Sequence, residues 1–239
     1  MRTPLVSESL AVFKACYGRD IDTVIDVGAQ GQTNFLMEAF PGAHHHLFEP
    51  VITYHETLAA NYRRAGIAHT IVPVAVSDSE GQMHQHLLSE DGSGNVTHSQ
   101  LLDQPDVARF GSRLVRILPT PVLSLDHWAS RTDLGQEVVV KIDVDGIESR
   151  IIDGGADTIR RSCLLIVEAT LATLVERASR VQALGMRLFD VVGNGYYFDQ
   201  LQQVDLVFVA QRVVASNVAF RPFEASGHVI WDRWQSWSR

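Results

Sequence analysis

Short apolar runs alternate with amphipathic stretches over the first third of the chain. Residues 21–27 are nearly all apolar, which is typical of a strand buried on both faces of a parallel sheet. Residues 44–48 and 71–76 predict two further strands. Apolar residues at helical spacing predict helices between them, over residues 4–17, 33–40 and 53–65. This alternation of strand and helix predicts an α/β fold with a parallel sheet.

The regular pattern is lost from Ser77 to about Pro119. Within this segment Gly92, Ser93, Gly94 and Asn95 predict a turn, and residues 99–117 predict a broken helix. Long irregular segments inside an α/β domain are often binding loops or lids. Residues 79–120 are therefore interpreted as a substrate-binding insertion.

Regular elements return near Ser124, where a helix is expected to start. The final strands are separated by the turn-rich segment GNGYYFDQ, which suggests an antiparallel pair. No internal repeat or linker is visible, so residues 1–239 are expected to form a single domain. The predicted strands of this part are residues 138–143, 164–168, 186–192 and 204–210, and the predicted helices are residues 147–161 and 171–184.

The two ends of the chain carry their own patterns. The N-terminal helix lies within residues 1–20, and the C-terminal tail covers residues 213–239. Trp231, Trp234 and Trp237 recur in this tail at helical spacing, which favours a packing stripe. The same aromatic tail could alternatively pack on a second copy of the chain, which would make a homo-oligomer.

Composition narrows the choice of partners. The chain has 239 residues and a formal net charge of −8, with no Lys/Arg-rich run, so we expect no nucleic-acid partner. A small basic patch around Arg109, Arg113 and Arg116 is the one exception to this charge balance. No apolar stretch is long enough to span a membrane, and no secretory signal is visible. Cys16 and Cys163 have no nearby cysteine partner, so free thiols and a cytoplasmic location are expected.

A glycine-rich turn follows the first strand. Gly28 and Gly31 allow a ligand to approach the backbone closely, and Glu49 at the end of the second strand can accept hydrogen bonds from ribose hydroxyls. A dinucleotide-binding loop would have glycine where this chain has Gln30 and Thr33. In dinucleotide-binding loops the second glycine makes room for the pyrophosphate. S-adenosylmethionine has no phosphate, so the absence of this glycine favours S-adenosylmethionine as the ligand. Asp26 is expected to order the loop and hold the ammonium end of the methionine moiety.

Seven segments in order resemble the FkbM-type methyltransferases: VIDVGAQGQ, HLFEP, VAVSD, LSLDHW, VVVKIDVDGIE, LLIVEAT and LQQVDLVFV. The resemblance implies a class I S-adenosylmethionine-dependent fold (Rossmann-like, three-layer), with a mostly parallel seven-stranded sheet whose last strand is antiparallel. It implies O-methylation, often of sugar hydroxyls in glycans or natural products. The family usually has asparagine at the position of Gln30, and the longer glutamine keeps the amide but is not assumed to make the same contact. The expected cofactor-binding residues are Asp26, Gly28, Ala29, Gln30, Gly31, Gln32, Glu49, Pro50, Val76 and Ser77.

Three charged residues alternate at the end of the strand over residues 138–143. Lys141, Asp143 and Asp145 share one side of the extended chain at the edge where ligands bind in open α/β sheets. Asp143 is the candidate general base, or the group that orients the acceptor hydroxyl, and Lys141 is expected to tune it by pairing with Asp143 or Glu168. Glu148 is interpreted either as functional or as an acid that starts a helix.

Metal and histidine sites are the weaker candidates. No metal is expected, although Asp143, Asp145 and Glu168 could instead supply oxygen ligands to Mg²⁺. His84 and His86 share one face of the chain and could help to hold an acceptor.

The sequence therefore predicts an S-adenosylmethionine-dependent O-methyltransferase for a carbohydrate or another small-molecule hydroxyl. The alternatives are an N-methyltransferase, an NAD-dependent oxidoreductase and a non-catalytic ligand-binding module.

Overall fold

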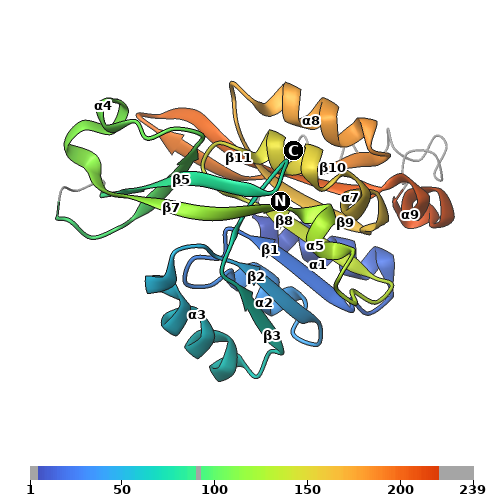
Figure 1. Ribbon diagram of the computed structural model, residues 1–239. Helices are drawn as coiled ribbons and strands as arrows, with labels where there is room; N and C mark the ends of the chain where they lie inside the picture. The colour runs from blue at the N-terminus through green and yellow to red at the C-terminus, as the bar shows by residue number, and fades with distance from the viewer. Residues whose placement is uncertain (1–4, 90–92, 221–239) are drawn as a thin grey trace.

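The computed structural model describes residues 5–89 and 93–220. Its core is a seven-stranded sheet with the strand order β10-β11-β9-β8-β1-β2-β3 (Figure 1). All neighbouring strands are parallel except β11, which is antiparallel to both β9 and β10. The predicted α/β fold and antiparallel last strand are thus confirmed. The strands are β1 Thr23–Val27, β2 His44–Phe48, β3 His69–Val72, β8 Val138–Ile142, β9 Leu164–Thr170, β10 Met186–Tyr197 and β11 Gln200–Ala210.

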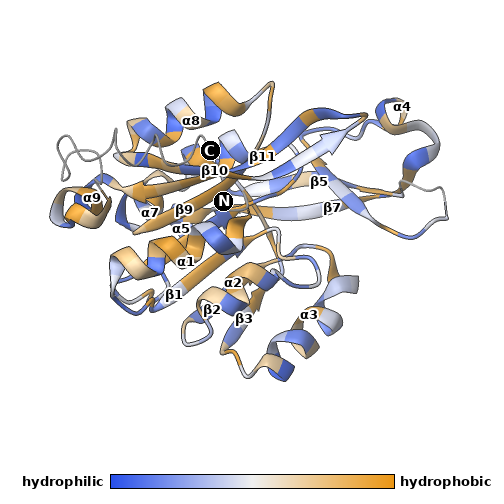
Figure 2. Ribbon diagram, turned by 180° about the vertical axis from the view of Figure 1, so that it is seen from behind, coloured by the Kyte–Doolittle hydropathy of each residue, from blue (hydrophilic) through white to orange (hydrophobic). Residues whose placement is uncertain are grey.

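Helices cover both faces of this sheet (Figures 1 and 2). Side chains of β2 show the two layers, because His45 contacts Tyr62 of α3 whereas His46 and Phe48 contact Trp128 of α5. The three adjacent histidines therefore point to opposite faces, as predicted, and do not form one site. One layer contains α1 Val6–Tyr17, α2 Asn34–Ala39 and α3 Ile52–Ala65, and the other contains α5 Leu125–Ala129, α6 Glu148–Gly154, α7 Ala156–Arg161 and α8 Leu174–Ala183.

The centre of the sheet is buried on both faces. Every residue of β1 and β8 is buried, which is why their sequences are nearly continuous apolar runs rather than alternating ones. The two charged residues in these strands, Asp26 and Lys141, are register partners and therefore lie side by side. The chain ends its described part with α9 Gln211–Ser216 and a 3-10 turn, Val218–Phe220, whose Phe220 ring lies close to that of Phe13 in α1.

A second sheet replaces the predicted irregular segment. It has four strands in the order β4-β7-β5-β6, and the predicted broken helix over residues 99–117 is wrong except for two short consecutive helical turns over residues 107–113. The predicted strand over residues 71–76 is also divided, because β3 ends at Val72 and β4 belongs to the second sheet. These elements are β4 Ala75–Ser77, β5 Gly81–Leu88, β6 His98–Leu102, α4 Val107–Phe110, the 3-10 turn Gly111–Arg113 and β7 Leu114–Ser124.

Two prolines explain why β7 does not resemble a strand in sequence. Pro119 and Pro121 pair with β5 on one side, but β4 contacts β7 only from Val122 onward. The other edge of β7 is therefore not paired with β4 at the prolines, where a missing N–H is tolerated.

The last two strands form a longer hairpin than predicted. β10 extends to Tyr197, and β11 begins at Gln200. Phe198 and Asp199 between them have φ values of 51° and 60°, which are typical of a tight two-residue hairpin turn. Register shifts on both sides of Gly195 absorb the glycine-rich segment that had predicted a loop.

Several smaller predictions concern the termini and cysteines. Cys16 and Cys163 are both free. The predicted tryptophan stripe of the tail lies outside the described residues. Among the described helices, none has the length and apolar character needed to cross a membrane.

Candidate functional site

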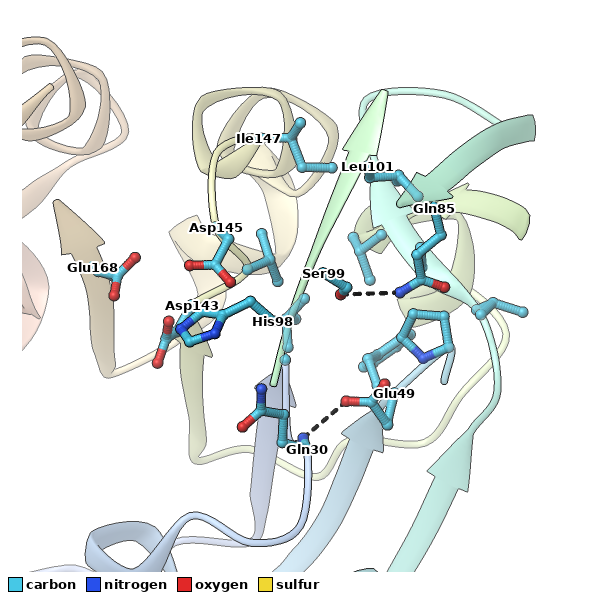
Figure 3. Close-up of a pocket in the computed structure, with 18 of the residues that line it drawn as sticks. Gln30, Glu49, Gln85, His98, Ser99, Leu101, Asp143, Asp145, Ile147 and Glu168 are labelled. Atoms are coloured by element: carbon cyan, nitrogen blue, oxygen red, sulfur yellow. Dashed lines mark hydrogen bonds between the residues drawn. The ribbon is translucent and has the colours of Figure 1, made fainter. Parts of the chain in front are cut away.

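A cavity of about 260 Å³ lies at the carboxyl edge of the seven-stranded sheet (Figure 3). Its walls come from the loop after β1, the ends of β2, β8 and β9, the second sheet and the β10–β11 hairpin. Parallel strands all present their carboxyl ends at this edge, so residues distant in sequence meet there. The residues that line it are Val27, Gly28, Gln30, Phe48, Glu49, Pro50, Val74, Ala75, Val76, Gln85, His98, Ser99, Leu101, Asp143, Val144, Asp145, Ile147, Glu168, Tyr197 and Gln203.

The loop after β1 is fixed by a close approach of two backbones. Gly28 has a φ of 88°, and a Cβ atom on it would lie 1.9 Å from the carbonyl oxygen of Asp143. Only glycine fits at this position. Gln30, with a φ of 45°, lines the cavity next, whereas the neighbouring Ala29, Gly31 and Gln32 do not.

Glu49 connects this loop to the end of β2. Its two carboxylate oxygens accept hydrogen bonds from the backbone N–H groups of Gln30, at 2.8 Å, and Val51, at 2.7 Å. Burial raises the pKa of Glu49, and these two hydrogen bonds act in the opposite direction. Figure 3 shows the Glu49 carboxyl group across the cavity from Asp143 and Asp145. Each carboxylate oxygen keeps further lone pairs, so Glu49 can still accept a hydrogen bond from a ligand hydroxyl.

Lys141 is the buried charge at the centre of the site. Its ammonium lies 3.1 Å from a carboxylate oxygen of Asp26 and 3.4 Å from one of Asp143, and it donates a hydrogen bond of 3.0 Å to the carbonyl oxygen of Gly28. Burial alone would lower the pKa of Lys141, but the two carboxylates outweigh it and raise the pKa. Lys141 is therefore a permanent cation that positions its neighbours, and it does not line the cavity.

Asp26 lies behind the wall of the cavity. Its side chain is 0% exposed, compared with 40% for Asp143, and it is not among the residues that line the cavity. Its contact with the loop runs through Lys141, which binds both the Asp26 carboxylate and the carbonyl oxygen of Gly28. The expected pairing of Lys141 with Asp143 is present, and the second partner is Asp26 instead of Glu168.

The turn that follows β8 carries two half-buried acids of the site. Asp143 and Asp145 both line the cavity, and Asp145 has a φ of 60°, a conformation that is uncommon for a residue other than glycine. Glu148 stabilises this turn, because its two carboxylate oxygens accept hydrogen bonds from the N–H of Gly146 at 3.1 and 3.3 Å. Glu148 is fully buried and forms an ion pair with Arg177 of α8, so its role is structural.

Glu168 of β9 completes an acid-rich wall. Burial, followed by the nearby charges of Asp143 and Glu148, raises the pKa of Glu168 to about 8. The amide of Gln203 on β11 donates a hydrogen bond to it. Asp205, further along β11, has its pKa raised to about 6 mainly by burial. Its surroundings therefore favour the protonated form of Glu168 over the carboxylate.

The second sheet supplies residues that the sequence analysis missed. Gln85 donates a hydrogen bond of 3.2 Å to the hydroxyl of Ser99, and His98 extends from β6 toward the two aspartates (Figure 3). No clear alternation of polar and apolar residues marks β5, because His84, Gln85 and His86 are followed by Leu87 and Leu88, so its period gave no signal for this face. The expected acceptor-holding pair, His84 and His86, is not there: neither lines the cavity, and His86 is buried against Phe110.

Of the expected cofactor contacts Pro50, Val76 and Ser77, only the first two line the cavity. Pro50 and Val76 line the cavity, as Glu49 does. Ser77 is fully buried, and its hydroxyl donates a hydrogen bond to Asp78 instead of facing the cavity. Within residues 5–89 and 93–220, no three His, Cys, Asp or Glu side chains are grouped in a way that could hold a metal ion.

The strand order and the loop-and-acid arrangement at this edge define the class I fold of S-adenosylmethionine-dependent methyltransferases. A model of the FkbM methyltransferase domain matches residues 26–191, which is more than half of the chain. The chain therefore belongs to the FkbM methyltransferase family. A comparison with curated protein sequences gave no match.

Solved structures give more distant similarities. A methyltransferase FkbM from Methylobacillus flagellatus KT is 13% identical with a TM-score of 0.49, over 78% of this chain and 44% of that one. The precorrin-6y C5,15-methyltransferase from Geobacter metallireducens GS-15 is 12% identical with a TM-score of 0.45, over 88% of this chain and 92% of that one. The N-methyltransferase NodS from Bradyrhizobium japonicum WM9 is 8% identical with a TM-score of 0.41, over 85% and 93% respectively. The chain spans less than half the length of the FkbM structure, and the family assignment rests on the domain model.

Replacement of Lys141 by methionine is expected to lower the free energy of unfolding by about 3–5 kcal/mol, because it leaves the buried Asp26 carboxylate without its cation. Urea denaturation measures this change. The double variant Asp26→Asn/Lys141→Met removes both charges and should be more stable than Lys141→Met alone. A single variant as stable as the wild type would show that the ion pair is not structural.

The raised pKa of Glu168 predicts a pH-dependent stability. Its protonated form stabilises the folded state, and this contribution is fully present below about pH 4 and is lost as the pH rises through about 8. The melting temperature of Glu168→Gln should therefore rise relative to the wild type between pH 5 and pH 9, by about 2–4 °C per kcal/mol. Glu56→Gln, an exposed change on α3, is the control. A constant difference across this pH range would contradict the assignment.

Proposed function

We propose that the chain methylates a hydroxyl group of a carbohydrate or small natural-product acceptor, with S-adenosylmethionine as the methyl donor. The observation that carries this proposal is the cavity in which Glu49, from β2, and Asp143, from the end of β8, line opposite sides. An acid at the end of the second strand suits the hydroxyls of a nucleoside ribose, and a carboxylate on the opposite side suits a general base for the acceptor.

The lining of the cavity fits the proposed cofactor. Phe48, Val76 and Ile147 give it apolar walls, which suit an adenine ring. Glu49 would accept hydrogen bonds from the ribose, and the backbone near Gly28 and Gln30 would lie against the methionine part. The acids at the other side favour a ligand that carries positive charge. S-adenosylmethionine supplies a methyl group on a positively charged sulfur, which fits this electrostatic environment.

The chemical task of the protein is to prepare the acceptor oxygen. In the proposed reaction Asp143 accepts the proton of the acceptor hydroxyl while that oxygen forms its bond to the methyl carbon and the carbon–sulfur bond breaks. Lys141 fixes the Asp143 carboxylate through the 3.4 Å contact, so its orientation does not have to be created during the reaction. General base assistance of this kind contributes about 10²–10⁴-fold to the rate.

N-methylation is the nearest alternative, because an acid-lined cavity also attracts an ammonium group. The net charge of −8 disfavours a nucleic-acid acceptor. The missing second glycine of the loop disfavours an NAD-dependent oxidoreductase, and the half-buried Asp143, held by Lys141, disfavours a non-catalytic binding module.

The cofactor assignment is tested by calorimetric titration with S-adenosylmethionine, S-adenosylhomocysteine and NAD. We expect the first two to bind, and binding of NAD alone would overturn the proposal. In the same assay Glu49→Ala should weaken S-adenosylhomocysteine about tenfold or more, because a hydrogen bond to a charged group contributes about 1.5–3 kcal/mol. Glu56→Gln should leave the affinity unchanged, since this residue is exposed on α3.

The role of Asp143 is tested separately from cofactor binding. Asp143→Asn should reduce the rate of S-adenosylhomocysteine release at least about 100-fold with the best acceptor from a glycoside panel, and should largely preserve cofactor affinity. Asp157→Asn, an exposed change on α7, is the matched control. Near-normal turnover of Asp143→Asn would exclude Asp143 as the base.

A further inference from the structure

A second cavity continues the site outward. This outer groove has a volume of about 320 Å³ and shares His98, Asp145, Tyr197 and Gln203 with the cavity at the sheet edge. One wall is the second sheet, and the other is formed by the β10–β11 hairpin and the end of β9. A molecule in the outer groove would therefore reach the inner cavity at His98 and Asp145, beside Asp143.

The outer groove differs from the inner cavity in chemistry. Its walls carry the amides of Gln100, Gln202 and Gln203, each of which can donate and accept hydrogen bonds. Tyr197 adds an aromatic ring that is largely exposed near the hairpin tip. Neutral hydrogen-bonding groups and a flat apolar ring suit an acceptor that carries several hydroxyl groups.

Arg113 is the feature that distinguishes this groove. Of the described residues that line either cavity, it is the only lysine or arginine. No carboxylate of residues 5–89 or 93–220 forms an ion pair with its side chain, whereas Arg150, for example, pairs with Asp78 and Asp103. Arg113 therefore presents a planar cation with unused donors to a ligand in the groove.

The balance of charge changes from the inner cavity to the outer groove. Among the described residues, Glu49, Asp143, Asp145 and Glu168 line the inner cavity without a lysine or arginine, whereas in the outer groove the only carboxylate is the shared Asp145 and Arg113 adds a cation. An acceptor with one anionic group is repelled from the inner cavity by that group and attracted by it to Arg113. Only one orientation of such a molecule is favourable, with a neutral hydroxyl directed inward.

We infer that the outer groove is the acceptor-binding site and that it selects a polyhydroxylated acceptor with a carboxylate or phosphate group, which Arg113 binds. This inference rests on the proposed function, because it assigns the inner cavity to the methyl donor. Arg113 is a specificity-determining residue here and takes no part in the chemical step.

The experiment measures binding of three small glycosides to the protein saturated with S-adenosylhomocysteine. The probes are methyl β-D-glucuronide, methyl β-D-glucoside 6-phosphate and the neutral methyl β-D-glucoside. The binding of each probe is measured by ligand-observed NMR titration. We expect at least one anionic probe to bind more tightly than the neutral one. In Arg113→Ala that anionic probe should bind about tenfold more weakly, and the neutral probe should be unaffected.

Two further variants separate recognition from net charge. Arg116→Ala removes a neighbouring exposed arginine on β7 that does not line the groove, and it should behave as the wild type. Arg113→Lys should retain part of the preference. Preference for the glucuronide indicates a carboxylate acceptor, and preference for the 6-phosphate indicates a phosphate acceptor.

The inference is overturned if the neutral glycoside binds as well as both anionic probes, if none of the three binds, or if Arg113→Ala and Arg116→Ala weaken binding equally. A prior titration with S-adenosylhomocysteine distinguishes this failure from that of the proposed function. If the wild type does not bind S-adenosylhomocysteine, the proposed function itself fails. If it does bind and Arg113 makes no difference, only the assignment of the outer groove is wrong.

Discussion

The buried ammonium of Lys141 is the interaction on which the site depends. Asp26 and Lys141 are adjacent in the register of β1 and β8, so their ion pair crosses the two central strands of the sheet. The same ammonium holds the carbonyl of Gly28 and the carboxylate of Asp143. The loop after β1 and the candidate base are therefore fixed relative to each other by one ammonium group. Burial alone would disfavour this charge, and the two carboxylates stabilise it.

A second buried ion pair fixes the other side of the site. Arg177 of α8 pairs with Glu148 and also donates a hydrogen bond of 2.6 Å to the carbonyl oxygen of Glu168. Because Glu148 in turn binds the N–H of Gly146, this pair connects α8, β9 and the turn that carries Asp145. The unusual backbone conformation of Asp145 is supported by this surrounding framework, as expected for a strained residue at a functional site.

Much of the main sheet and part of the site could be predicted from sequence. Gly28, Glu49 and Asp143 follow buried strands, and the carboxyl ends of parallel strands meet at one edge. The pairing of Lys141 with Asp26 could not be predicted, because it depends on the register between β1 and β8. The second sheet was missed because Pro119 and Pro121 are residues that usually exclude a strand, and they are tolerated only through the local pairing of β7. Tyr197 and Gln203 lie on the long strands β10 and β11. The glycine-rich segment at the register shifts of β10 is typical of a loop, so the sequence did not predict that these strands extend to the site.

The distribution of charge within the site restricts which ligands can bind more closely than the net charge of the chain does. Asp143, Asp145 and Glu168 line the inner wall, and burial, followed by the neighbouring negative charges, raises the pKa of Glu168 to about 8. Such a wall attracts a sulfonium and repels an anion, so any negative group of an acceptor must remain outside it. Arg113 in the outer groove provides a place for that group in a chain whose net charge of −8 would otherwise oppose the approach of an anion. The electrostatic requirement of the methyl donor therefore also restricts the acceptor, because the inner acids determine which end of the acceptor can enter.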